Sequence, residues 1–304
     1  MSKFKKLFKR TFTPNNNEII NNEPDNYVEI NNDINDNIIN EPDNYVEVII
    51  EPDNIKEIIN ESIWVNLEPI KISKIKKVDF PTDQYYHIET PKNQITIHHT
   101  VSGKGVRGDI NYWLSDSKRI STHFIIDHDG IPYQCYNSKY WGHHLGVKST
   151  FLKNNGFDDY KTRNVLLNES SISIEIDSWG GLILGDGNSK KFGRKTIITE
   201  KDKYYNAYGN IVDVPVIHYP EGFRGYYYYE KYTDEQIRTL GELLLFFGKR
   251  YNIPLDYNDN IWDVNMDALS GKSGVYSHSS YREDKSDCHP QSELIDMLKT
   301  LKSL

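Results

Sequence analysis

The chain has 304 residues, enough for one large domain or two domains of ordinary size. Its formal net charge of −8 argues against general binding to nucleic acids. It contains only 2 cysteines, which excludes a disulfide-rich secreted fold. No apolar stretch is long enough to span a bilayer, and the basic N-terminus lacks the apolar core of a signal peptide. We therefore expect a globular protein with no membrane span and no signal peptide.

Residues 1–62 differ in composition from the rest of the chain. A basic segment, residues 1–10, precedes an acidic, Asn-rich tract in which a unit beginning Glu-Pro-Asp-Asn recurs. Pro-Asp-Asn is a turn signal, and the tract is too polar to bury a core of its own. We predict a low-complexity arm that is either disordered or docks on a protein partner. From Ile63 onward the pattern is that of a globular domain, which we place at residues 63–304.

The first part of this domain predicts three strands. Residues 94–100 have the pattern of a buried strand, and it ends in two adjacent histidines, His98 and His99. Residues 122–127 and 131–136 are expected to pair across a His-Asp-Gly turn. A buried strand has no packing reason to end in two imidazoles, so we regard both as candidate site residues.

Residues 171–176 alternate between isoleucine and polar side chains, the pattern of a strand with one buried face. The polar side chains, Ser171, Ser173 and Glu175, share the other face. If that face lines a cleft, Glu175 is a candidate for catalysis. If it faces water, Glu175 has no such role.

The second part of the domain contains an insertion and two helices. Residues 180–232 are rich in Gly and Tyr, and we expect a surface insertion that walls a cleft. A helix is predicted from an N-cap at Thr233 to a stop before Pro254, and a closing helix starts at Pro290. Strands that alternate with helices without a strict repeat predict an α/β fold, with a single mixed sheet flanked by helices.

Residues 274–290 supply several side chains that bind metals. Residues 274–277 are predicted to form a short strand that brings His278 to a sheet edge, and Asp287 and Cys288 follow in a polar loop. A catalytic zinc takes three protein ligands and keeps one open position. The candidate donors are His98 or His99, His278, and either Asp287 or Cys288.

Five segments, in this order, resemble the zinc-dependent N-acetylmuramoyl-L-alanine amidases of the type 2 family, which includes phage amidase-type lysozymes and peptidoglycan recognition proteins. They are residues 95–100, residues 121–130, Trp141 with His143, residues 171–175, and His278 with Lys285 and Asp287. The resemblance covers about residues 90–302, and residues 180–232 are atypical of the family.

The resemblance implies a reaction and a set of roles. The reaction is hydrolysis of the amide bond between the lactyl group of N-acetylmuramic acid and L-alanine of the peptidoglycan stem peptide. The implied cofactor is Zn²⁺, held by His98, His278 and Asp287. Glu175 would act as general base, and Lys285 would stabilise the oxyanion. Zinc lowers the pKa of a bound water from 15.7 to about 7, so a nearby carboxylate can complete the deprotonation at neutral pH.

The sequence departs from the family pattern at two points. Thr122 stands where some members carry a tyrosine, so the base would have to be Glu175. The third ligand is ambiguous, because some branches use a cysteine that is followed directly by proline. Here His289 separates Cys288 from the proline, whereas Asp287 fits the branch with an acidic ligand. We favour Asp287, with Cys288 as the alternative.

Substrate-binding candidates are the side chains that suit sugar rings or peptide carboxylates: His99, Trp141, His143 and Arg282. The alternative for them is ordinary packing. The expected partner is peptidoglycan. We expect a cell-wall lysin such as a phage endolysin, located in the host cytoplasm before release or associated with a virion. The alternative function is a non-catalytic peptidoglycan-binding or virion structural protein.

Overall fold

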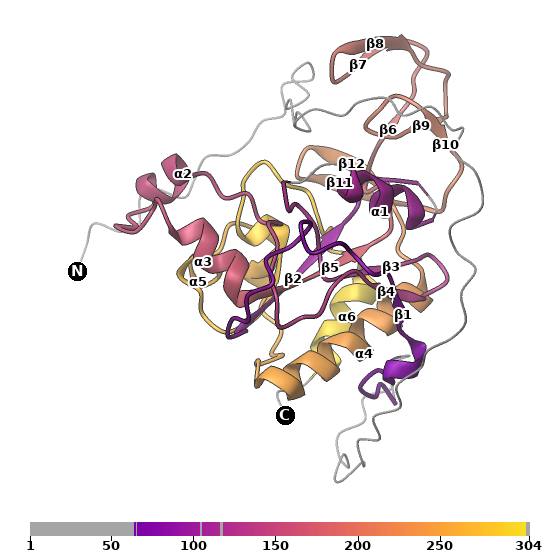
Figure 1. Cartoon of the computed structure of the whole chain (residues 1–304). Helices are drawn as coiled ribbons and strands as arrows, with labels where there is room; N and C mark the ends of the chain where they lie inside the picture. Colours follow the sequence, from indigo (N-terminus) through magenta and orange to yellow (C-terminus); the bar gives the residue numbers. More distant parts are fainter. Residues whose placement is uncertain (1–63, 65, 104, 116–117, 302–304) are drawn as a thin grey trace.

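The computed structural model describes Trp64 and residues 66–103, 105–115 and 118–301 (Figure 1). The predicted arm at residues 1–62, with its repeated unit and basic segment, lies outside the described residues. Among the helices that the structure describes, none is long and apolar enough to cross a membrane.

A six-stranded mixed sheet forms the centre of the domain, in the order β1-β4-β3-β5-β2-β13. Strands β3, β5, β2 and β13 run parallel to one another, β4 is antiparallel to β3, and β1 is parallel to β4. The strands are β1 (Lys76–Lys77), β2 (Gln94–His99), β3 (Phe124–Ile126), β4 (Pro132–Gln134), β5 (Ser171–Ile176) and β13 (Gly274–Ser277). The predicted fold class, a mixed α/β sheet with flanking helices, is confirmed.

Six α-helices are described around the sheet, and α4 and α6 lie side by side next to it (Figure 1). The α-helices are α1 (Arg107–Leu114), α2 (Ser149–Asn154), α3 (Arg163–Ser170), α4 (Asp234–Tyr251), α5 (Met266–Ser270) and α6 (Ser292–Thr300). Short 3-10 turns are η1 (Ile72–Lys74), η2 (Asp259–Trp262) and η3 (His278–Ser280).

Helix α4 forms where the sequence predicts it. The Thr233 hydroxyl accepts a hydrogen bond from the backbone N–H of Gln236, whose side chain in turn accepts from the Thr233 N–H, so a capping box closes the helix start. Helix α6 begins at Ser292, so the predicted start at Pro290 was two residues early. The reason is that Gln291 is held in an extended conformation, its side chain bonded to both backbone groups of Tyr232.

The two faces of the central sheet differ in polarity, and this difference positions the site. One face is apolar and shares its core with α4 and α6; its side chains in β2 and β5 are Ile95, Ile97, Ile172, Ile174 and Ile176. Since successive strand residues point to opposite faces, His98 and Glu175 lie on the other, polar face. The prediction that only one face of β5 is buried was wrong, because all 6 of its residues are buried. The imidazole of His144 covers Ser171 and that of His123 covers Ser173 on the polar face.

The segment predicted as an insertion contains a second, five-stranded sheet in the order β10-β9-β6-β12-β11. Its strands are β6 (Gly181–Leu184), β9 (Tyr204–Tyr205), β10 (Ile211–Val212), β11 (Val216–Phe223) and β12 (Tyr226–Glu230). A separate hairpin consists of β7 (Ser189–Phe192) and β8 (Lys195–Ile198). Gly180 links β5 to this sheet with a φ of +64°, and a Cβ there would overlap the imidazole of His99.

A buried ion cluster joins the two sheets. His128, in the turn between β3 and β4, places Nδ1 3.1 Å from Asp177 Oδ2 and Nε2 2.9 Å from Glu230 Oε1. Burial lowers the pKa of His128, but hydrogen bonds to Asp177 and Glu230 outweigh it and raise that pKa to about 10. We call these three side chains the His128 triad. It ties the end of β12 to the residue that follows β5.

Candidate active site

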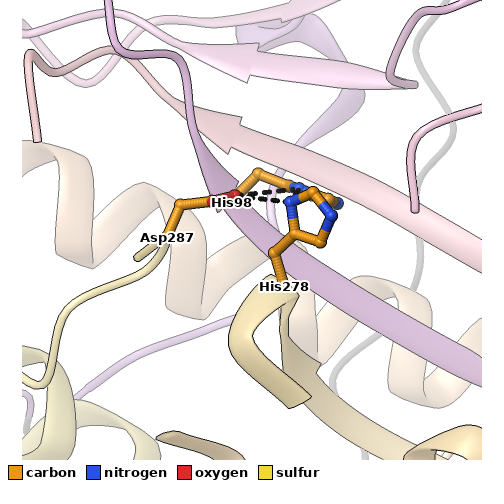
Figure 2. Close-up of side chains that lie close together, drawn as sticks. All are labelled: His98, His278 and Asp287. Atoms are coloured by element: carbon orange, nitrogen blue, oxygen red, sulfur yellow. Dashed lines mark hydrogen bonds and ion pairs between the residues drawn. The ribbon is translucent and has the colours of Figure 1, made fainter. Parts of the chain in front are cut away.

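Three predicted ligands meet at the carboxyl end of the central sheet (Figure 2). His98 lies near the end of β2, His278 follows β13 directly, and Asp287 comes from the loop beyond. The Nδ1 atoms of His98 and His278 are 3.0 Å apart, and Asp287 Oδ2 lies 3.2 Å from the first and 2.8 Å from the second. All three side chains are buried. The predicted position of β13, which brings His278 to the sheet edge, is confirmed.

This donor set fits a zinc-sized ion. Ligand atoms on a tetrahedral zinc with bonds of about 2.0–2.1 Å are separated by roughly 3.3 Å, close to the three distances above. Two imidazole nitrogens and one carboxylate oxygen form a ligand set typical of catalytic zinc, and three protein ligands leave a fourth position open. The His98–His278–Asp287 cluster therefore has both the composition and the spacing of a catalytic metal site.

The protonation states in the cluster also suit a metal. Burial and the neighbouring His278 lower the pKa of His98 to about 4, so its imidazole is neutral at pH 7 and one ring nitrogen has a free lone pair. Burial alone would raise the pKa of Asp287, but the neighbouring His278 and His98 hold it well below its usual range. The cluster thus offers a neutral imidazole on His98 and an ionised carboxylate on Asp287.

Glu175 stands beside this cluster. It is the β5 residue in register with His98 on β2, and its side chain lies on the same polar face. Only 9% of Glu175 is exposed, so it does not face bulk water. Its Oε2 is buried and has no hydrogen-bond partner among the described residues. Burial, and next the charges of Asp287 and Asp109, raise the pKa of Glu175 well above its usual range, while Lys285 opposes this. Glu175 is therefore suited to accept a proton.

The loop after η3 supplies Lys285, Asp287 and Cys288. The charge of Lys285 lowers the pKa of both Glu175 and Asp287, so its ammonium group acts on the region between them. Cys288 is fully buried, and burial raises the pKa of its thiol well above the usual range. Its thiol is not among the donors that converge with His98 and His278. This arrangement favours Asp287 over Cys288 as the third donor.

The predicted substrate-binding residues supply none of the three converging donors. His99 points to the opposite face from His98 and is buried, with Nδ1 2.8 Å from the Tyr232 hydroxyl. Trp141 is buried and stacks on Tyr86, with ring centroids 3.8 Å apart.

The other two predicted substrate-binding residues are partly exposed. His143 Nε2 lies 3.2 Å from the Tyr86 hydroxyl. Arg282 makes two hydrogen bonds to Asp284, of 2.9 and 2.7 Å, and its Nη1 lies next to Gly146. Arg282 is thus held in place by Asp284 and directed toward the loop that contains His144.

A sequence profile of the N-acetylmuramoyl-L-alanine amidase family matches residues 89–290. The chain belongs to this family. The matched segment contains the three converging donors, His98, His278 and Asp287, together with Glu175 and Lys285. The predicted family membership and the predicted class of enzyme, a peptidoglycan amidase, are confirmed.

Several solved structures resemble this amidase. PlyL is 15% identical, with 74% of this chain and 97% of PlyL covered and a TM-score of 0.40. The endolysin amidase LysCS from Clostridium intestinale is 14% identical, with 70% and 86% covered and a TM-score of 0.34. The Staphylococcus aureus hydrolase AmiA, solved with its ligand, is 12% identical, with 77% and 84% covered and a TM-score of 0.40. No curated protein matches the chain significantly.

The imidazole of His144 contacts the amidase site and was not predicted from the sequence. His144 places Nδ1 3.0 Å from His98 Nε2 and Nε2 2.7 Å from the Ser171 hydroxyl. The motif considered in that loop was Trp141 with His143, and the neighbouring histidine was passed over. The signal available was the pair of adjacent imidazoles, because on an extended segment only one of the two can face the sheet.

Proposed function

We propose that this amidase binds one zinc ion through His98, His278 and Asp287 and hydrolyses the N-acetylmuramoyl–L-alanine bond of peptidoglycan. The observation that carries the proposal is the convergence of three zinc-competent donor atoms, 2.8 to 3.2 Å apart, next to a buried and unpaired carboxyl group. Zinc, when bound, supplies Lewis acidity that lowers the pKa of a water to about 7 and polarises the substrate carbonyl.

Glu175 acts in this proposal as the general base. It takes a proton from the attacking water as the water oxygen bonds to the lactyl carbonyl carbon. It then gives that proton to the alanine nitrogen as the carbon–nitrogen bond breaks, so the products are a free lactyl carboxylate and an intact peptide with a free amino terminus. A base works best when its pKa lies near the working pH, and the burial that raises the pKa of Glu175 moves it in that direction.

Lys285 stabilises the oxygen that becomes negative during the attack. In support of this role, the positive charge of Lys285 lowers the pKa of both Glu175 and Asp287. Removing one preorganised group of this kind typically costs about 10²- to 10³-fold in kcat. His99, Trp141, His143 and Arg282 stay predictions for substrate binding. Among them, Arg282 is best suited to a stem-peptide carboxylate, because Asp284 fixes its guanidinium plane.

We also propose that residues 63–304 act as the catalytic unit and that residues 180–232, which include the second sheet, are an addition to it. In this proposal the arm at residues 1–62 has no part in catalysis. A chain lacking residues 1–62 would then keep its rate on soluble muropeptides. Loss of activity in such a folded, zinc-loaded chain would refute this division of roles.

The test of the function uses purified peptidoglycan and the purified, zinc-loaded full chain. We expect turbidity to fall and one new free L-alanine amino group to appear for each bond cut, with both effects abolished by a chelator and restored by zinc. Asp287→Ala should lose the metal and the activity, whereas Cys288→Ala should keep both. The rival function, wall binding without catalysis, predicts that the chain sediments with peptidoglycan and releases no amino termini.

A further inference from the structure

Two neighbouring residues of one loop, His144 and Leu145, contact both imidazoles of the metal cluster. The Nδ1 of His144 lies 3.0 Å from Nε2 of His98. The backbone carbonyl of Leu145 lies 2.9 Å from Nε2 of His278. In each imidazole, the contacted nitrogen is the one opposite the Nδ1 that meets Asp287. The loop therefore reaches the outer nitrogen of each imidazole in the cluster.

These contacts bear on which nitrogen of each imidazole carries the proton. A carbonyl oxygen only accepts, so Nε2 of His278 must donate to Leu145, which leaves Nδ1 as the nitrogen of that ring that can offer a lone pair to a metal. On the other ligand, a free lone pair on His98 Nδ1 requires Nε2–H of His98 to donate to Nδ1 of His144, whose own Nε2–H then donates to the Ser171 hydroxyl 2.7 Å away. If these two hydrogen bonds ran in the opposite direction, the proton would lie on His98 Nδ1, the atom that must bind the metal.

His144 itself is not a fourth ligand. Its ring meets the ring of His98 edge-on, with centroids 5.1 Å apart and planes at 82°, on the side away from Asp287. The cluster of donor atoms within reach of a common ion contains His98, His278 and Asp287 but not His144. His144 can therefore act on a metal only through His98.

The side chain of Asn168 holds the loop that contains His144 and Leu145. Asn168, in α3, is fully buried, and its Oδ1 accepts the backbone N–H of His144 at 2.8 Å and that of Leu145 at 3.1 Å. Its Nδ2 donates to the carbonyl of Asn164, which fixes the orientation of the amide. The same continuous segment thus supplies Asn168, Ser171 and Glu175.

We propose that His144 is a positioning residue, which holds His98 in the tautomer whose Nδ1 is free for the metal, with Ser171 fixing the orientation of His144. The inference rests on the proposed function, since it requires that the cluster binds zinc. Groups that orient a ligating histidine in this way typically change metal affinity by about 10- to 100-fold.

The experiment measures the zinc dissociation constant of the full chain by competition with a chromogenic chelator. His144→Leu keeps the bulk of the side chain and removes the acceptor, and we expect zinc to bind about 10- to 100-fold more weakly. His144→Asn places an oxygen near the position of Nδ1 and should recover part of that loss. The matched control is His218→Leu, a change of an exposed imidazole on β11, which should leave zinc affinity unchanged.

A second, milder variant tests the same inference if His144→Leu does not fold. Ser171→Ala removes one hydroxyl and leaves His144 in place, and we expect a smaller but measurable loss of zinc affinity. In the metal-free chain, ¹⁵N chemical shifts of the His98 ring should move from the Nε2–H tautomer toward the Nδ1–H tautomer in both variants. Unchanged zinc affinity in folded His144→Leu or in Ser171→Ala would overturn the inference. If the parent chain binds no zinc, the proposed function fails instead.

Discussion

Glu175→Gln tests the assigned base with the smallest change in shape. The amide has nearly the volume of the carboxyl group but cannot take a proton from water. Because general-base catalysis typically contributes about 10²- to 10⁴-fold, kcat should fall by that factor, equivalent to about 2.7–5.4 kcal/mol in the barrier. Zinc content should stay at the parent value, because Glu175 is not among the three converging donors.

The same substitution should stabilise the metal-free chain at neutral pH. Burial raises the pKa of Glu175 in the folded state above the ordinary value of 4.5 that it has in the unfolded chain. Over the pH range between these two pKa values, the folded chain keeps the carboxyl proton of Glu175 and the unfolded chain has lost it. Its contribution to stability is therefore present below pH 4.5 and is lost as the pH rises through the folded pKa. Glutamine carries no charge to bury, so the melting temperature of Glu175→Gln should exceed that of the parent increasingly from about pH 4.5 upward.

Steady-state rates on a soluble muropeptide and thermal melts of chelator-treated protein provide both readouts. Glu221→Gln, on the exposed side of β11, is the matched control, and it should change neither rate nor melting temperature. A kcat within about threefold of the parent would refute the assignment of the base. A variant that is inactive because it has lost zinc would place Glu175 in the metal site instead.

Three further outcomes are expected. Lys285→Met should lower kcat by about 10²-fold with little change in KM or zinc content, since it acts on developing charge; a change in KM alone would assign it to substrate binding. Gly180→Ala should destabilise the fold by about 1–3 kcal/mol in urea titrations, because its Cβ would overlap His99 and its φ is +64°; an unchanged midpoint would contradict this packing. The His128 triad raises the pKa of His128 from 6.5 to about 10, so its stabilisation is full below pH 6.5 and is lost as the pH rises through about 10. Melts should show this loss in the parent and not in His128→Phe.

The positions of the two histidine ligands could be predicted because they lie at the ends of strands that the residue pattern reveals. His98 and His278 each stand at or just past the end of a short apolar strand, and parallel neighbours in a sheet bring such ends together. Glu175 followed from the alternation of β5, which puts it on the face opposite three isoleucines. The alternation of side chains along β2 likewise implies that His99 points away from His98.

The remainder of the site depends on contacts that no local pattern records. His144 reaches His98 only because Asn168, on a different element, bonds to the loop backbone. The second sheet was predicted only as an insertion, because its strands β9 and β10 have 2 residues each and are too short for a period to appear. Burial of the polar face of β5 was also missed, since the loops that cover it come from distant segments.

Zinc titration of the metal-free chain tests the central claim most directly. The measured quantity is the initial rate of cleavage of a soluble N-acetylmuramoyl–L-alanine peptide as zinc is added back. The account predicts no activity without metal, a linear rise that ends at one zinc per chain, and no recovery in His98→Ala at any zinc concentration near the protein concentration. Cleavage by the metal-free chain, or stoichiometric zinc binding with no release of the L-alanine amino terminus, would contradict it.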